Sequence, residues 1–198
     1  PFFTRVARGA EDKAKQMGLQ ILFSNSDEDF KKEADYIDML LSTKVDGVLL
    51  APTGDQSKKN IRKLIKHDIP FVLIDRKIDG IGSDLVLGDN YEGTRKLVEH
   101  LIEQGHQKIA LINGPSSVST ARERQKAYVE TLKLSGLPLN EKIMAQIHFK
   151  QDDANAVVEN FLSLPKQDRP TAIFAGNNFI AVSTIKALRH FGVDVPEG

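Results

Sequence analysis

The chain has 198 residues, 40% of them hydrophobic and 27% charged, with 27 basic residues balancing 27 acidic ones. This composition is ordinary for a globular protein, and a net charge of zero gives the chain no electrostatic reason of its own to hold nucleic acid or a membrane surface. The absence of cysteine excludes disulfides, thiolate catalysis and cysteine-ligated zinc. No apolar run approaches the roughly 20 residues of a membrane-spanning helix.

The first half of the chain alternates between helical patterns and apolar runs of strand length. Val6, Ala10, Ala14 and Met17 recur at helical spacing and predict a first helix, which Gly18 ends. The remaining patterns predict a strand at 19–23, a helix at 29–42, a strand at 45–51, a helix at 57–67, strands at 71–74 and 85–87, and a helix at 91–103.

The pattern starts again after Gly105. It predicts strands at 108–113, 143–149 and 171–175, and helices at 120–135, 152–164 and 179–191. Apolar strands that alternate with helices indicate parallel sheets covered on both faces. The number of units is high for one sheet, so we predict an α/β fold of two doubly wound lobes. The boundary is expected near 104–107, which makes 1–104 the N-terminal lobe and 105–198 the C-terminal lobe.

The chain also looks like a segment of a longer protein that is truncated at both ends. It opens on Pro1-Phe2-Phe3, with no initiating Met, and passes directly into a helical pattern. It stops at Val195-Pro196-Glu197-Gly198, a loop sequence that usually leads to another element.

Several catalytic and cofactor motifs are absent from the sequence. There is no phosphate-binding Gly-x-x-x-x-Gly-Lys-Ser/Thr loop and no Gly-x-Ser-x-Gly nucleophile elbow. Gly80-Ile81-Gly82 lacks the third glycine and the helix of a dinucleotide loop, and the five histidines are not paired at metal-ligand spacing. We therefore expect no cofactor, no metal and no enzymatic activity.

In open parallel α/β sheets, ligands bind beyond the carboxyl ends of the strands, so the polar and aromatic residues there are the candidates for a site. Those candidates are Phe2 and Phe3, which open the first helix, together with Asp75, Arg76, Asp89, Arg124, Phe149 and Asn177. Aspartate accepts hydrogen bonds, arginine donates them in a planar fork, asparagine does both, and aromatic faces cover the C–H faces of a sugar. The mixture suits a polyhydroxylated ring.

Each candidate also has an interpretation that involves no ligand. Asp75 and Arg76 could form a surface turn or pair with each other, and Arg124 could be a charge on a helix surface. Phe149 could belong to the core. Asn177 and Asp89 could be helix caps. Their shared position at the same sheet edge is what favours a binding site.

The chain resembles the regulatory core of the lactose/galactose repressor family, and more distantly the periplasmic ribose-binding proteins. The stretches that carry the resemblance are Pro1-Phe2-Phe3, Val45-Asp46-Gly47-Val48-Leu49-Leu50, Phe71–Ile74 with Asp75-Arg76, Asp89-Asn90-Tyr91-Glu92-Gly93, Gly105-His106, Gly114-Pro115 with Ala121-Arg122-Glu123-Arg124, Arg169-Pro170-Thr171-Ala172-Ile173-Phe174 with Asn177, and Gly192-Val193-Asp194-Val195-Pro196. No single stretch is specific, but their order and spacing are, and they cover the whole chain.

The resemblance implies a periplasmic-binding-protein-like type I fold, in which two lobes surround a cleft and are joined by three crossovers. It implies that all the candidates above line that cleft, with Glu92 as a further candidate. Two departures from the family are visible. Asn178 stands where the family commonly has an aspartate, and the sequence ends before a later cleft aspartate of the family.

The resemblance further implies the effector-binding and dimerisation core of a cytoplasmic transcription regulator. The expected effector is a small sugar, for which a pentose such as ribose is the leading candidate. The expected partners are a second copy of the chain and operator DNA, the latter bound by an N-terminal helix-turn-helix outside this segment, with no membrane partner. Two other interpretations stay open: a secreted sugar-binding protein of a transport system, and an α/β enzyme with an unrecognised site.

Overall fold

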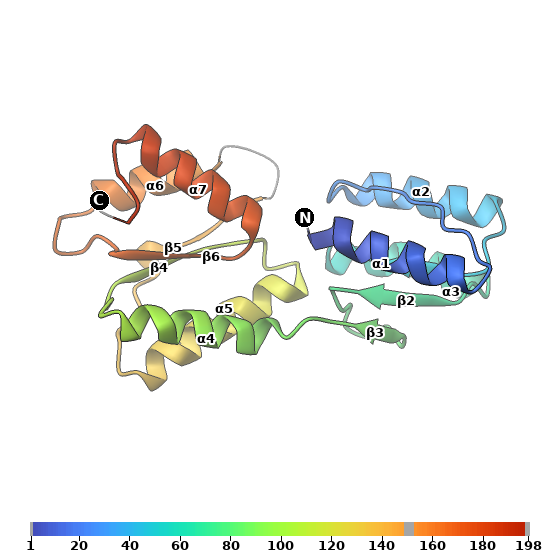
Figure 1. Ribbon diagram of the computed structural model, residues 1–198, viewed down its shortest axis with the longest axis horizontal. Helices are drawn as coiled ribbons and strands as arrows, with labels where there is room; N and C mark the ends of the chain where they lie inside the picture. The colour runs from blue at the N-terminus through green and yellow to red at the C-terminus, as the bar shows by residue number, and fades with distance from the viewer. Residues whose placement is uncertain (1, 149–152, 197–198) are drawn as a thin grey trace.

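The computed structural model describes residues 2–148 and 153–196 and contains two parallel sheets of three strands each. Figure 1 shows the sheets in two lobes that lie side by side. The first lobe contains α1 (Phe2–Gln16), α2 (Phe30–Ser42), β1 (Val48–Leu50), η1 (Asp55–Ser57), α3 (Lys58–Lys66), β2 (Phe71–Ile74) and β3 (Asp84–Val86). The second contains α4 (Asn90–Glu103), β4 (Ile109–Asn113), α5 (Ser119–Leu134), η2 (Glu141–Ile143), β5 (Met144–Gln146), α6 (Asp153–Ser163), β6 (Ala172–Ala175) and α7 (Asn178–His190).

The first sheet has the strand order β1-β2-β3 and is covered on one face by α2 and α3. Ile37 of α2 and Leu64 of α3 pack on Val48 of β1, while Ile61 packs on Leu73 at the centre of the sheet. All five side chains are buried. Each aliphatic side chain that is buried at this contact stabilises the folded state by roughly 1.5–3 kcal/mol.

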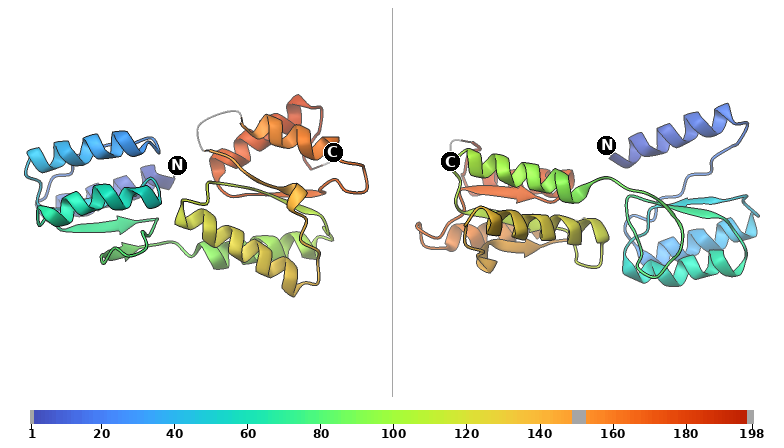
Figure 2. Two further views of the ribbon diagram at one scale, coloured as in Figure 1. Left: turned by 180° about the vertical axis from the view of Figure 1, so that it is seen from behind. Right: turned by 90° about the horizontal axis from the view of Figure 1, so that it is seen from below.

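Of the described elements, α1 alone lies on the other face of the first sheet; it is apart from α2 and α3 (Figure 2, right) and has no buried residue. The strand predicted at 19–23 is wrong: these residues form no strand, and Leu19, Leu22 and Phe23 are exposed. An apolar run becomes a strand only when a neighbouring strand accepts its hydrogen bonds. Among the described residues, none pairs with this segment.

The second sheet has the order β5-β4-β6, and its central strand is buried along its full length. Successive side chains of a strand point to opposite faces. Ala110 and Ile112 accordingly pack with the side of α6 and α7, whereas Ile109 and Leu111 pack with α4 and α5. Tyr128 of α5 is buried, donates a hydrogen bond to the Ile109 carbonyl at 2.7 Å, and burial raises its pKa to about 12.

Packing places α4 with the second lobe, although the sequence suggested a boundary after this helix, near 104–107. Val98, Leu101 and Ile102 of α4 join Tyr128 and Leu132 in the core on one face of the second sheet. Gly105 ends the helix in the left-handed region, at φ 90°, but the chain does not change lobes there. We therefore propose that the boundary lies between β3 and α4, near 87–89.

The length and polarity of a helix decide whether it could span a membrane. In residues 2–148 and 153–196, none of the helices has both the length and the apolar character that crossing a bilayer requires.

A buried carboxylate holds the loop that follows β1. Glu33 of α2 is only 2% exposed. Its Oε2 accepts hydrogen bonds from the Thr53 amide at 2.8 Å and the Ser57 hydroxyl at 2.9 Å, and its Oε1 accepts one from Asn60 Nδ2 at 2.8 Å. One side chain thus fixes the loop, the short helix η1 and the start of α3.

Replacing Glu33 should therefore destabilise the fold. Glu33→Ala leaves three buried donors without their acceptor, and we expect the free energy of unfolding to fall by about 3 kcal/mol or more. Glu11→Ala, at an exposed position on α1, is the control and should change it by less than about 0.5 kcal/mol. Urea unfolding followed by circular dichroism measures both. Equal effects of the two substitutions would contradict this role of Glu33.

Candidate functional site

The carboxyl ends of the two sheets face each other across the junction of the lobes (Figure 1). In the first lobe, the loops at 24–29, 51–57 and 75–83 gather at this junction because the strands that precede two of them run parallel. In the second lobe, the loop at 114–118 and the start of α7 lie at the corresponding edge. The region between the sheets is thus lined by loops and helix starts. These residues lie outside the hydrogen-bonded strands.

Asp75 follows β2 directly and is the central acidic group of this region. Its backbone lies in the left-handed region, at φ 66°, and its amide donates to the Val86 carbonyl at 2.8 Å. Burial raises the pKa of the Asp75 carboxyl, while the charges of Arg76 and Arg124 oppose that shift. Its side chain is 13% exposed, so this is a carboxylate largely withdrawn from water that faces two guanidinium groups.

Arg124 of the second lobe is within electrostatic range of Asp75. It stands on the first turns of α5, and its Nη2 donates to Asn90 Oδ1 at 2.7 Å. Burial lowers the pKa of Arg124, and the charge of Asp75 works against that change. An arginine with a lowered pKa still carries its charge at neutral pH. Asp75 and Arg124 thus lie within electrostatic range of each other from opposite lobes, without a direct ion pair.

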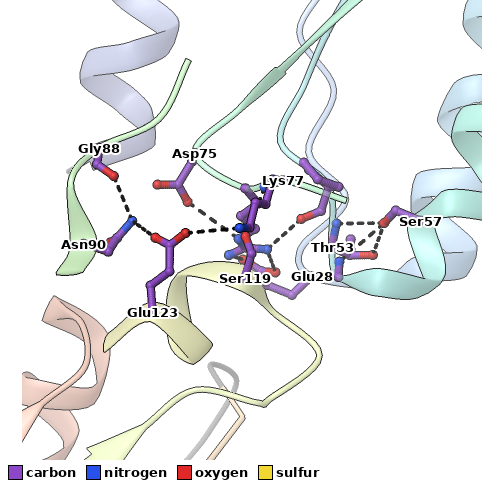
Figure 3. A network of polar contacts seen from close by, with 12 residues as sticks. Glu28, Thr53, Ser57, Asp75, Lys77, Gly88, Asn90, Ser119 and Glu123 are labelled. Atoms are coloured by element: carbon purple, nitrogen blue, oxygen red, sulfur yellow. Dashed lines mark hydrogen bonds and ion pairs between the residues drawn. The ribbon is translucent and has the colours of Figure 1, made fainter. Parts of the chain in front are cut away.

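Arg76 is positioned differently from what the sequence suggested. It is 6% exposed, and its two terminal nitrogens donate to both carboxylate oxygens of Glu28, at 2.6 and 2.7 Å. Nη1 also donates to the Pro52 carbonyl at 2.9 Å, and Nε lies 3.6 Å from Asp75 Oδ2. These contacts, part of the network in Figure 3, join three loops of the first lobe. Arg76 thus stabilises the floor of the region through a partner, Glu28, that the sequence interpretation did not single out.

Two of the predicted ligand-binding residues act as helix caps in this structure. Asp89 accepts a hydrogen bond from the Glu92 amide at 2.9 Å and begins α4, and Asn177 accepts one from the Ile180 amide at 2.8 Å and begins α7. Asn177 keeps its amide group at the carboxyl edge of β6. Beside Asp89, it is the neighbouring Asn90 that contacts Arg124.

Glu123 is a second acidic group that the sequence interpretation missed. It accepts a hydrogen bond from Asn90 Nδ2 at 3.4 Å and lies 3.9 Å from Lys77 Nζ. Figure 3 shows Asp75, Lys77, Asn90 and Glu123 grouped near the start of α5. The sequence carried one signal for this group, since Glu123 lies between Arg122 and Arg124 in the helix that follows β4.

The predicted aromatic residues are only partly described. Phe2 and Phe3 stand at the start of α1, which points to the junction of the lobes (Figure 1), and are 52% and 41% exposed. Their rings pack edge to face, with centroids 5.1 Å apart. The prediction for Phe149 falls outside the described residues.

A pocket of about 530 Å³ is lined by Lys77, Asn90 and Glu123 of this polar group, whereas Asp75 and Arg124 do not line it. Its lining combines the loop after β2, the crossover between the lobes and one face of α5: Lys77, Asp79, Leu87, Gly88, Asp89, Asn90, Tyr91, Ser119, Arg122, Glu123 and Lys126. Asp89 is the one predicted residue in that lining. We therefore base the site on the chemistry of the Asp75–Arg124 region and not on this hollow.

The lobes also touch directly. The Asp55 amide donates to the Ser117 carbonyl at 2.9 Å, and Arg122 Nη1 donates to Asp55 Oδ2 at 2.8 Å. At Gly54 a Cβ atom would lie 3.2 Å from the Ser117 carbonyl oxygen, so glycine permits this approach. The Lys77 amide adds a hydrogen bond to the Ser119 hydroxyl at 3.0 Å.

The floor of the second lobe has a comparable close approach. Asn113, at the end of β4, is buried, and its Nδ2 donates to the Ala121 carbonyl at 2.8 Å, which joins the strand to α5. Gly176 lies against it: an added Cβ would be 2.4 Å from Asn113 Oδ1. This contact fixes the spacing between the carboxyl ends of β4 and β6.

Metal binding has no clear support. Among residues 2–148 and 153–196, no group of three His, Asp or Glu side chains is arranged to hold a metal ion. The site residues instead include both hydrogen-bond donors and hydrogen-bond acceptors, which suit a polar organic ligand.

The chain belongs to the family described as periplasmic binding proteins and sugar binding domain of LacI family, whose model matches residues 1–198. It is 30% identical over 200 residues to the HTH-type transcriptional regulator DegA of Bacillus subtilis, covering 100% of this chain and 58% of DegA. It thus spans just over half the length of this relative. The fold class and family expected from the sequence are confirmed.

Solved structures of transcription regulators share the fold of this chain. A putative ribose operon repressor from Burkholderia thailandensis superposes with a TM-score of 0.87 at 29% identity, covering 99% of this chain and 71% of that one. A transcriptional regulator CelR–cellobiose complex superposes with a TM-score of 0.83 at 26% identity, covering 100% of this chain and 60% of that one.

The buried state of Asp75 has a consequence for stability. The folded protein holds the Asp75 proton more tightly than the unfolded chain, in which the pKa has its ordinary value of 3.8. As pH rises above 3.8 the unfolded chain ionises first, and this lowers the stability of the folded state until the raised pKa has been passed. The free energy of unfolding of wild type, relative to that of Asp75→Asn, should therefore be highest in acid and fall with rising pH.

Urea unfolding of wild type and Asp75→Asn at several values between about pH 4 and pH 7 measures this difference. The charged residues that face Asp75 are Arg76, Arg124, Glu28 and Glu123, and all four are present in both proteins. A difference in stability that is constant across pH, or that increases with pH, is the result that would contradict the raised pKa.

Proposed function

We propose that the chain is the effector-binding core of a LacI-type transcription regulator, and that it binds a small neutral sugar between the carboxyl ends of its two sheets. The observation that carries the proposal is that the facing carboxyl ends of the two sheets bring Asp75 of the first lobe within electrostatic range of Arg124 of the second, which Asn90 holds in place. A sugar hydroxyl donates to a carboxylate and accepts from a guanidinium, so one ligand can engage both. A ligand held by both lobes favours one arrangement of the lobes over others.

A pentose such as ribose is the specific effector we propose. Asp75, Arg124, Asn177 and the aromatic pair Phe2 and Phe3 supply acceptors, donors and apolar faces at the edges of the sheets. The Burkholderia structure is named a ribose operon repressor, which agrees with this choice, whereas CelR is named as a complex with cellobiose. Phe149 remains a proposed member of the site.

Two other interpretations of the fold are less well supported. A secreted transport protein would share the fold, but DegA is an HTH-type transcriptional regulator, and this favours a regulator that works in the cytoplasm. An enzyme would need a nucleophile or general base beside a second reactive group. Asp75 faces guanidinium groups instead, so we propose a binding function without catalysis.

Binding of D-ribose by the full-length regulator tests the proposal. Arg124→Ala should weaken it about 10- to 150-fold, roughly 1.5–3 kcal/mol, because a charged hydrogen-bond donor is lost. The control is Arg95→Ala on α4, whose arginine pairs with Glu92 and Glu99 on the helix surface. Calorimetry with D-ribose, D-glucose and adenine should show ribose binding tightest. Binding of adenine alone, or equal affinity of Arg124→Ala and wild type, would count against the assignment.

We further propose that operator DNA is bound by a helix-turn-helix outside this segment, and that the regulator acts as a homodimer. The segment itself carries no net charge, and charge neutralisation of phosphates supplies most of non-specific DNA affinity. In a mobility-shift experiment with competitor DNA, the full-length protein should retard its operator, whereas residues 1–198 should not. Retardation by the segment at equal strength would overturn this division of labour.

A further inference from the structure

Glu28 and Arg76 form a two-point ion pair at the carboxyl edge of the first sheet. The two terminal nitrogens of Arg76 each donate to one carboxylate oxygen of Glu28, at 2.6 and 2.7 Å. This fork-to-fork geometry is the one in which a guanidinium binds a carboxylate or phosphate most strongly. Glu28 therefore occupies the same face of Arg76 that an acidic ligand would use.

The position of Glu28 is set by the backbone and not by a regular element. Asp27 and Glu28 both lie in the left-handed region, at φ 51° and 60°, immediately before Asp29, which caps α2. The two strained residues turn the chain so that the Glu28 carboxylate meets Arg76. The side chain of Glu28 is 30% exposed, whereas that of Arg76 is 7% exposed, so the carboxylate is the solvent-facing half of the pair.

The charges around the pair decide which ligands can approach. Besides Glu28, the acidic groups of the region are Asp75 and Glu123, and the cationic groups are Arg76, Arg124 and Lys77, which lies 3.9 Å from Glu123. With Glu28 bound to Arg76, an anion entering the cleft meets an occupied arginine and two further carboxylates. A neutral polyol has no charge for these carboxylates to repel, and it can donate its hydroxyl protons to them.

We propose that Glu28 sets the charge selectivity of the cleft: it holds Arg76 in a two-point pair and so excludes phosphorylated and carboxylated ligands in favour of neutral sugars. The inference rests on the proposed effector cleft and names the ligand class that the cleft rejects. Its chemical basis is competition, because a ligand phosphate can reach the Arg76 fork only by displacing a carboxylate that is already bound there. Removing the Glu28 charge leaves the fork available.

The experiment compares one neutral and two anionic probes on the full-length protein. Wild type should bind D-ribose in preference to D-ribose 5-phosphate and should not bind inorganic phosphate measurably. Glu28→Gln keeps the shape of the side chain and one acceptor for Arg76, and it should gain about 10-fold or more in affinity for both anions. Glu28→Ala is a second neutral variant with the same expected gain, and circular dichroism verifies the fold of each.

Two further variants separate the local pair from general charge effects. Glu99→Gln removes one negative charge from α4, where Glu99 pairs with Arg95, and should leave anion affinity unchanged. Glu28→Asp keeps the charge on a shorter side chain and should still exclude the anions. A gain in Glu99→Gln equal to that in Glu28→Gln would overturn the proposal.

The remaining outcomes distinguish this inference from the proposed function. If wild type binds D-ribose 5-phosphate as tightly as D-ribose, or if folded Glu28→Gln and Glu28→Ala gain no affinity for either anion, Glu28 is not the selectivity determinant. If wild type binds no pentose but Glu28→Gln gains binding of inorganic phosphate, the role of Glu28 stands and the choice of a pentose fails.

Discussion

Parallel strand pairing is the constraint on which the rest of this structure depends. Because β1, β2 and β3 run in one direction, the loops that follow β1 and β2 leave the same edge of the sheet, and the same holds for β4, β5 and β6 in the second lobe. Asp75, which follows β2, and Arg124, on the helix that follows β4, thereby come within electrostatic range although they are far apart in the sequence. The buried carboxylate of Glu33 then fixes one of these loops in place.

The contacts between the lobes are weaker than those within them. Arg122 and Asp55 pair across the junction with side chains 34% and 51% exposed, and exposed pairs of this kind contribute about 0–1 kcal/mol. Within each lobe, aliphatic side chains fill both faces of β4 and one face of the first sheet. Lobes that are rigid inside and loosely joined can change their relative arrangement when a ligand contacts both.

Local sequence signals predicted most elements of the fold, because each depends on residues close together in the chain. Asp29 and Asp89 mark the starts of α2 and α4, and the apolar run of β4 reflects burial on both faces. The predictions failed where the outcome depends on distant partners. Residues 19–23 are apolar but have no strand beside them among the described residues, and α4 joins the second lobe through packing that Gly105 does not reveal.

The same distinction applies to the site. Position at the sheet edge follows from topology, and it predicted that Asp75 and Arg124 would lie near the same junction, within electrostatic range. It did not predict that Glu28 would form a two-point ion pair with Arg76, because that pairing depends on the left-handed turn at Asp27 and Glu28. Position at the sheet edge also could not show whether Asp89 or Asn90 contacts Arg124, because neighbouring residues at a helix start point in different directions. The structure shows that Asn90 makes the contact.

The close approach of Gly176 to Asn113 limits how this region can vary during evolution. Its backbone is not in the left-handed region, so glycine is required there by crowding and not by conformation. Alanine would place its methyl group 2.4 Å from Asn113 Oδ1, and the amide that joins β4 to α5 would have to move. Arg124 stands on that helix. A change at Gly176 could thus alter the position of Arg124, which we propose contacts the effector, and Gly176 and Asn113 are expected to change together or not at all.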